Sequence, residues 1–89
     1  MTHEKPIVGK LYRVKLKSGR TWIFKSAYRG EYLTEFEAAY CINGGGNDYF
    51  TDRIERGRGC HVVGGNSDII SLTPANENEI AIFNRKLGL

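Results

Sequence analysis

The sequence has 89 residues, 40% of them hydrophobic and 26% charged, with a formal net charge of +3 and two cysteines. Such a composition is typical of an ordinary globular protein rather than a disordered chain, and two cysteines fit a reduced, cytosolic context better than a disulfide-rich secreted mini-protein. No apolar run approaches the roughly 20 residues that span a bilayer. We therefore expect one cytoplasmic domain with an N-terminal arm (1–8), a β-sheet (9–72) and a C-terminal helix (73–88). Because so short a chain forms only a thin core, we also expect a homo-oligomer.

Charge is distributed unevenly along the chain. Residues 1–30 hold eight basic residues and one acidic residue, whereas residues 31–89 hold five basic and nine acidic residues. Two interpretations remain open. The basic part binds an anionic partner, or the two parts of the chain attract each other within a molecule or between subunits.

A β-hairpin is the clearest local signal, because residues 9–16 and 20–28 are rich in β-branched and aromatic side chains and flank Lys17-Ser18-Gly19. A three-residue loop with Gly19 in the left-handed region is preferred to a two-residue loop, since it separates apolar from charged side chains. One face, expected in the core, then holds Tyr12, Val14, Leu16, Trp22 and Phe24. The other, expected to be a solvent-facing basic ladder, holds Leu11, Arg13, Lys15, Thr21, Ile23 and Lys25.

Residues 32–42 fit two structures. Alternation places Tyr32, Thr34, Phe36, Ala38, Tyr40 and Ile42 on one side of a strand, whereas Thr34 and Glu37 fit the capping box of a helix that ends near Gly44. We favour the strand because of its aromatic, alternating content. Three further short strands are expected around glycine-rich turns, at residues 49–54, 60–63 and 68–72.

The C-terminal segment is typical of an amphipathic helix. Thr73 suits the N-cap, Pro74 suits the first helical position, and Gly88 suits the end. An apolar stripe at helical spacing consists of Ile80, Phe83 and Leu87. So short a helix is marginal alone, and it must therefore pack against the sheet or a neighbouring subunit.

The strand and Thr-Pro-Ala step of residues 70–75, followed by Asn76-Glu77-Asn78-Glu79-Ile80, resemble the tails of many small uncharacterised phage and prophage proteins. The resemblance covers about the last twenty residues and implies an origin in a mobile element, with no implied activity. The asparagines among the glutamates depart from the commoner form of that tail.

Candidate ligand-binding residues are basic side chains and glycine-rich turns. The basic ladder and hairpin tip offer phosphate contacts, residues 53–58 form a second basic segment, and the turns at 44–47 and 64–67 expose backbone N–H groups to anions. The expected anion-binding set is Arg13, Lys15, Lys17, Lys25, Arg53, Arg56, Arg58, Gly45, Gly46 and Asn47. Solvated surface lysines and ordinary turn glycines are the structural alternative.

Catalysis and metal binding find no support in the pattern. Cys60 and His61 are adjacent and should point to opposite faces of a strand, so they should not form a nucleophile–base pair. The two cysteines and two histidines, His3 included, form neither a Cys-x-x-Cys pair nor a spaced histidine pair that could bind zinc. We therefore expect no enzyme, cofactor or metal. The expected fold is α+β: a small twisted antiparallel sheet, as a roll or partly open SH3-like barrel, with one C-terminal helix. The expected function is binding of an anionic ligand, either nucleic acid or a nucleotide signal that is sequestered from bacterial immunity. A protein–protein inhibitor, such as an anti-defence factor, or a structural accessory protein is the alternative.

Overall fold

The computed structural model describes residues 5–43, 48–49 and 63–87, which form one open antiparallel sheet and one helix. The strands are β1 (Leu11–Leu16), β2 (Thr21–Ser26), β3 (Phe36–Cys41), β4 (Asp48–Tyr49) and β5 (Ile69–Pro74). Their order across the sheet is β4-β3-β2-β1-β5. A 3-10 turn, η1 (Asn66–Asp68), precedes β5, and α2 (Glu77–Leu87) follows it. The α+β class and the open sheet with a C-terminal helix are confirmed.

The β1–β2 hairpin has the predicted register. Val14 lies opposite Trp22 and Tyr12 opposite Phe24. The three-residue loop closes through the Leu16 N–H, which donates to the Arg20 carbonyl at 3.0 Å, and the Gly19 N–H, which donates to the Leu16 carbonyl at 2.9 Å. Gly19 has a φ of 95°, which explains why glycine is needed there.

One face of the sheet carries the larger core, as expected from the hairpin. The buried residues of this first cluster are Tyr12, Val14, Leu16, Trp22, Phe24, Phe36, Ala39, Cys41 and Ile69. Side chains from the connecting segments help to close it. The Thr34 hydroxyl donates to the Gly64 carbonyl at 2.7 Å, and Asn66 accepts from the Leu33 N–H at 2.8 Å and donates to the Glu31 carbonyl at 3.0 Å.

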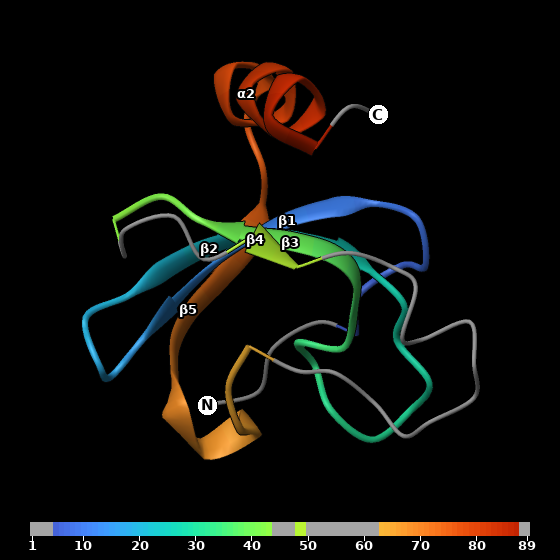
Figure 1. Ribbon diagram of the computed structural model, residues 1–89. Coiled ribbons are helices and arrows are strands. Elements are labelled where there is room, and N and C mark those ends of the chain that lie inside the picture. The colour runs from blue at the N-terminus through green and yellow to red at the C-terminus, as the bar shows by residue number, and fades with distance from the viewer. Residues whose placement is uncertain (1–4, 44–47, 50–62, 88–89) are drawn as a thin grey trace.

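The opposite face is also partly buried, which corrects the expectation of a solvent-facing basic ladder. Figure 1 shows α2 above this face, with η1 on the other side of the sheet. Phe83 of α2 is fully buried and joins Ile23, Ala38 and Tyr40 in a second cluster. Its ring centroid lies 6.0 Å from that of Tyr40. Phe83, the middle residue of the predicted stripe, therefore packs on the sheet of its own chain.

The strand interpretation of residues 32–42 is confirmed, although β3 begins only at Phe36. The single alternating face is wrong, because the register shifts where Lys25 lies opposite Ala38 and Ser26 opposite Phe36. The extra residue, Glu37, forms a bulge that turns Phe36 towards the first cluster and leaves Ala38 in the second.

Helix α2 begins later than predicted. Thr73 and Pro74 belong to β5, where they lie opposite Arg13 and Tyr12. The N-cap is Asn76, whose side chain accepts the Glu79 N–H at 2.8 Å while Glu79 accepts the Asn76 N–H at 3.0 Å. This reciprocal pair is a capping box with asparagine in the first position. Pairing with β1 outweighs the local helix-start signal at Thr73-Pro74. Of the remaining predicted strands, 50–54 and 60–62 lie outside the described residues.

Candidate functional site

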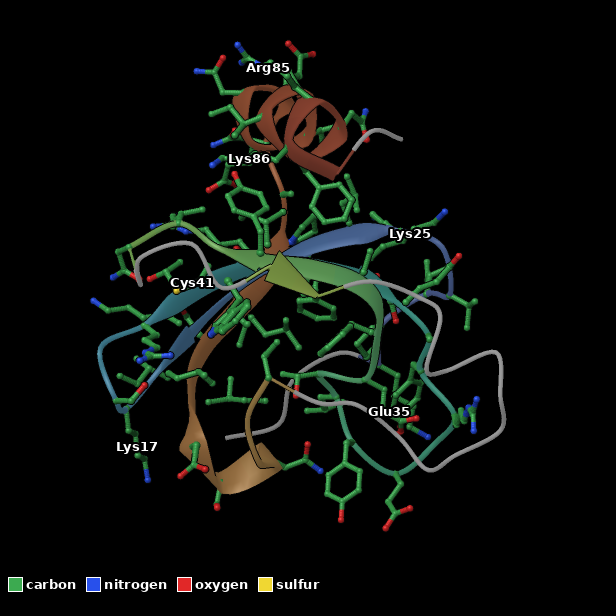
Figure 2. The ribbon with its side chains drawn as sticks, in the orientation of Figure 1. Lys17, Lys25, Glu35, Cys41, Arg85 and Lys86 are labelled. Atoms are coloured by element: carbon green, nitrogen blue, oxygen red, sulfur yellow. The ribbon has the colours of Figure 1, made fainter. Side chains whose placement is uncertain are left out.

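The tip of the β1–β2 hairpin carries three cations that lie close together in the sequence. Lys15 and Lys17 belong to the end of β1 and the loop, and Arg20 begins the return to β2; all three are exposed. Figure 2 places Lys17 at the tip, far from Lys25 at the opposite end of the strands. We call Lys15, Lys17 and Arg20 the hairpin-tip cations.

Hydrogen bonds to two other segments fix this tip in place. The Lys17 N–H donates to the Asp68 carbonyl at 2.9 Å, which ties the loop to η1. On the other side, the Asn43 side chain accepts the Thr21 N–H at 2.9 Å and donates to the Gly19 carbonyl at 2.8 Å. The cations therefore project from a braced hairpin end.

Two members of the predicted ladder are neutralised within the chain. Arg13 Nε lies 3.4 Å from Glu79 Oε2 on α2, and Lys25 Nζ lies 3.8 Å from Glu37 Oε2 in the β3 bulge. Each pair joins a basic residue of the first thirty to an acidic residue from later in the chain. The charge asymmetry is thus partly explained by attraction within one molecule. Because at least one side chain of each pair is about one third exposed or more, each pair contributes no more than about 1 kcal/mol.

The hairpin-tip cations differ from Arg13 and Lys25 in this respect. Among the described residues, none of the three forms an ion pair with a carboxylate. Arg20 was not singled out from the sequence, although the preferred register, which pairs it with Leu16, already places it at the tip. The other predicted anion-binding residues, Gly45, Gly46, Asn47, Arg53, Arg56 and Arg58, lie outside the described residues.

Aromatic rings of the hairpin are not available for stacking on a ligand. Trp22 is 4% exposed and Phe24 is fully buried, and both pack in the first cluster. Tyr12 and Phe24 instead contact each other, with ring centroids 5.9 Å apart. A ligand at the hairpin tip therefore meets charge and hydrogen-bonding groups without base-stacking platforms from these strands.

Cys41 is a buried thiol with its Sγ 3.4 Å from Asn43 Oδ1, which leaves it inaccessible to a substrate. Cys60, His61 and His3 lie outside the described residues. In the part of the chain that the structure describes, no group of three or more histidine, cysteine, aspartate or glutamate side chains is placed to hold a metal ion.

Comparisons with protein-family models, with curated proteins and with solved structures found no match to this chain. None of the helices among the described residues has the length and apolar character needed to cross a membrane. The functional proposal therefore depends on the chemistry of the hairpin tip and of the surface beside it.

Proposed function

We propose that the protein is a non-enzymatic binding protein that recognises an anionic ligand through the hairpin-tip cations. The observation that carries this proposal is the division of the basic residues into two groups. Arg13 and Lys25 have carboxylate partners, whereas Lys15, Lys17 and Arg20 have none among the described residues. Exposed cations that have no carboxylate partner in the described part of the chain favour contact with an external anion.

The shape of this surface favours an extended polyanion over a small ligand held in a pocket. The cations lie at a projecting turn, where a phosphate or carboxylate chain can approach without entering a cavity. With Trp22 and Phe24 in the core, binding of single-stranded nucleic acid would be electrostatic and largely independent of base sequence. Sequestration of a nucleotide signal would need additional contacts beyond the hairpin tip.

The resemblance of the C-terminal segment to tails of small phage proteins supports a phage-encoded protein that acts in the bacterial cytoplasm. Both nucleic acids and immune nucleotide signals are available as ligands there. Docking onto an acidic protein surface is the second candidate function. The exposed side chains of Ile42 and Ile70, on strands beside Lys15, favour it.

The test measures binding of a fluorescein-labelled twenty-nucleotide oligothymidine, used as a generic polyanion, by fluorescence anisotropy. Three phosphate contacts to a single strand give a slope of about −2 in a plot of log K against log salt. Affinity should therefore fall about 20-fold between roughly 50 and 200 mM salt. A variant with Lys15→Gln, Lys17→Gln and Arg20→Gln should lose this binding.

A matched variant removes the same formal charge away from the tip, by Lys10→Gln, Arg13→Gln and Lys25→Gln. We expect it to bind within about threefold of the wild type, because Arg13 and Lys25 already have carboxylate partners. Equal losses of affinity in both variants would show that net charge alone accounts for binding, and would refute a site at the tip. Wild-type protein that binds no oligonucleotide or other polyanion at about 50 mM salt would refute the proposal altogether.

A further inference from the structure

One row of side chains on the α2-facing side of the sheet is left uncovered by that helix. Lys15 lies opposite Ser71 on β5 and opposite Thr21 on β2. The next residue across, Ile42, donates its N–H to the Thr21 carbonyl at 2.9 Å. The neighbours of this row along each strand, Leu16, Trp22 and Cys41, belong to the first cluster on the other face. Alternation therefore places Lys15, Thr21 and Ile42 on the α2 side.

Ile70 extends this row at its β5 end. Ile69 and Leu72 both pack with the first cluster, although two residues separate them. The register shift between Lys15 and Leu16 accounts for the irregular spacing, because two residues of β5 there oppose one residue of β1. Ile70 and Ser71 consequently share the α2 side with Lys15. Thr21 is itself buried, at 6% exposed. We call the exposed members of this row, Ile70, Ser71, Lys15 and Ile42, the open row.

Helix α2 covers the adjacent row instead. Phe83 packs on Ile23 and Tyr40, and Glu79 pairs with Arg13 in that same row. In consequence Ile42 is 44% exposed and Ile70 is 51% exposed, with Lys15 exposed between them. Ile82 of α2, three residues after Glu79, is 39% exposed on the side of the helix that carries Glu79. Two of the large exposed apolar side chains of the described surface, Ile42 and Ile70, thus lie at the two ends of the row that holds Lys15.

The spacing of these groups defines the chemistry of a partner. Ile70 and Ile42 are separated by three strand-to-strand steps, or about 14 Å, with the lysine ammonium between them. The open row contains no carboxylate. A partner that presents a carboxylate between two apolar side chains on one face satisfies both features, whereas a phosphate backbone leaves the isoleucines in water. A second copy docked face to face, with the two-fold axis through the middle of the row, would bring Lys15 close to its own counterpart, which is unfavourable.

We propose that the open row is a docking surface for an acidic, amphipathic segment of another protein, with carboxylates at Lys15 and apolar side chains on Ile42 and Ile70. This inference rests on the proposed function to the extent that Lys15 belongs to both surfaces. It goes further by naming a polypeptide as the partner and by assigning a role to side chains outside the hairpin tip.

The test compares two labelled twelve-residue peptides by fluorescence anisotropy, one with three Leu-Ser-Glu-Ser repeats and the other with three Ser-Ser-Glu-Ser repeats. In an extended chain the first peptide presents leucine and glutamate in turn on one face. Both have the same charge. Wild-type protein should bind the leucine peptide at least about tenfold more tightly. A variant with Ile42→Thr and Ile70→Thr, which keeps β-branched residues, should reduce this preference to less than about twofold. A control with Ile7→Thr and Val8→Thr removes two apolar side chains that are even more exposed, 63% and 64%, from a distant turn, and this variant should retain the preference for the leucine peptide.

The outcomes separate the two proposals. Equal binding of both peptides that depends on the hairpin-tip cations would overturn the docking proposal and leave anion binding intact. Failure of the wild type to bind the leucine peptide while it binds oligothymidine has the same meaning and favours nucleic acid. Loss of the preference for the leucine peptide in the Ile7/Val8 control would also overturn the docking proposal. So would light scattering that gives the mass of a dimer for the wild type and of a monomer for the Ile42→Thr, Ile70→Thr variant. Absence of binding to any of these probes refutes both proposals.

Discussion

Replacing Phe83 by alanine should destabilise the whole domain, because this side chain is the fully buried anchor of α2. Phe83 is 0% exposed and fills the second cluster against Ile23, Ala38 and Tyr40. Removing a buried phenylalanine ring costs about 3–5 kcal/mol. A domain of this size has a total stability of roughly 4–13 kcal/mol, so the loss is a large share of it. An eleven-residue helix does not persist alone, and α2 should therefore unfold when it detaches.

The assay is thermal unfolding followed by far-ultraviolet circular dichroism, with urea titration to obtain the free energy. A loss of about 3 kcal/mol lowers the Tm of a domain of this length by at least about 12 °C. The matched control is Ile82→Ala on the same helix, where a partly exposed side chain should cost less than about 1 kcal/mol. A Phe83→Ala protein that melts within about 3 °C of the wild type would refute the packing of α2 on the sheet.

Two further substitutions test the side-chain hydrogen bonds that hold the hairpin tip and the start of α2. Asn43→Ala removes the acceptor of the Thr21 N–H and the donor to the Gly19 carbonyl, so the free energy of unfolding should fall by about 1–3 kcal/mol and the Thr21 amide should exchange faster with deuterium; unchanged exchange at Thr21 contradicts this role. Asn76→Ala removes the N-cap of α2 and should cost about 1 kcal/mol by urea titration. The exposed neighbour Asn78→Ala should cost much less, and equal losses at the two positions would show that the cap is not at Asn76.

The hairpin could be predicted from the sequence because its determinants are local. The alternation of residues 11–16 and 21–25 and a glycine at the left-handed position select one register, and the structure has that register. The burial of Trp22 follows from the same pattern. The C-terminal helix was also predictable in kind, because Phe83 lies in an apolar stripe at helical spacing.

The errors came from contacts between segments distant in sequence. Thr73 and Pro74 satisfy the local rules for a helix start, but pairing with β1 holds them in a strand. Asn76 and Glu79 already formed a capping box in the sequence and would have given the correct start. The bulge at Glu37 was not visible from alternation alone, since only the partner strand reveals the extra residue.

The candidate site was predicted only in part for a similar reason. Lys15 and Lys17 remain available, whereas Arg13 and Lys25 find carboxylates that lie far along the chain or in a bulge. The burial of Ile23 on the supposed solvent face depends on α2, so no pattern within the hairpin could indicate it. Within the hairpin, alternation therefore predicts which face a side chain occupies, and long-range packing decides whether that face is open.

The most direct test of anion binding at the hairpin tip is a titration of ¹⁵N-labelled protein with oligothymidine, followed by ¹H–¹⁵N correlation spectra at low salt. The account predicts that the largest shifts occur at the amides of Lys15, Lys17 and Arg20, that the amides of Lys25 and Phe83 stay unchanged, and that the shifts disappear as salt is raised. Shifts that centre on Lys25, or that are spread evenly over the basic residues of the first thirty positions, would contradict it.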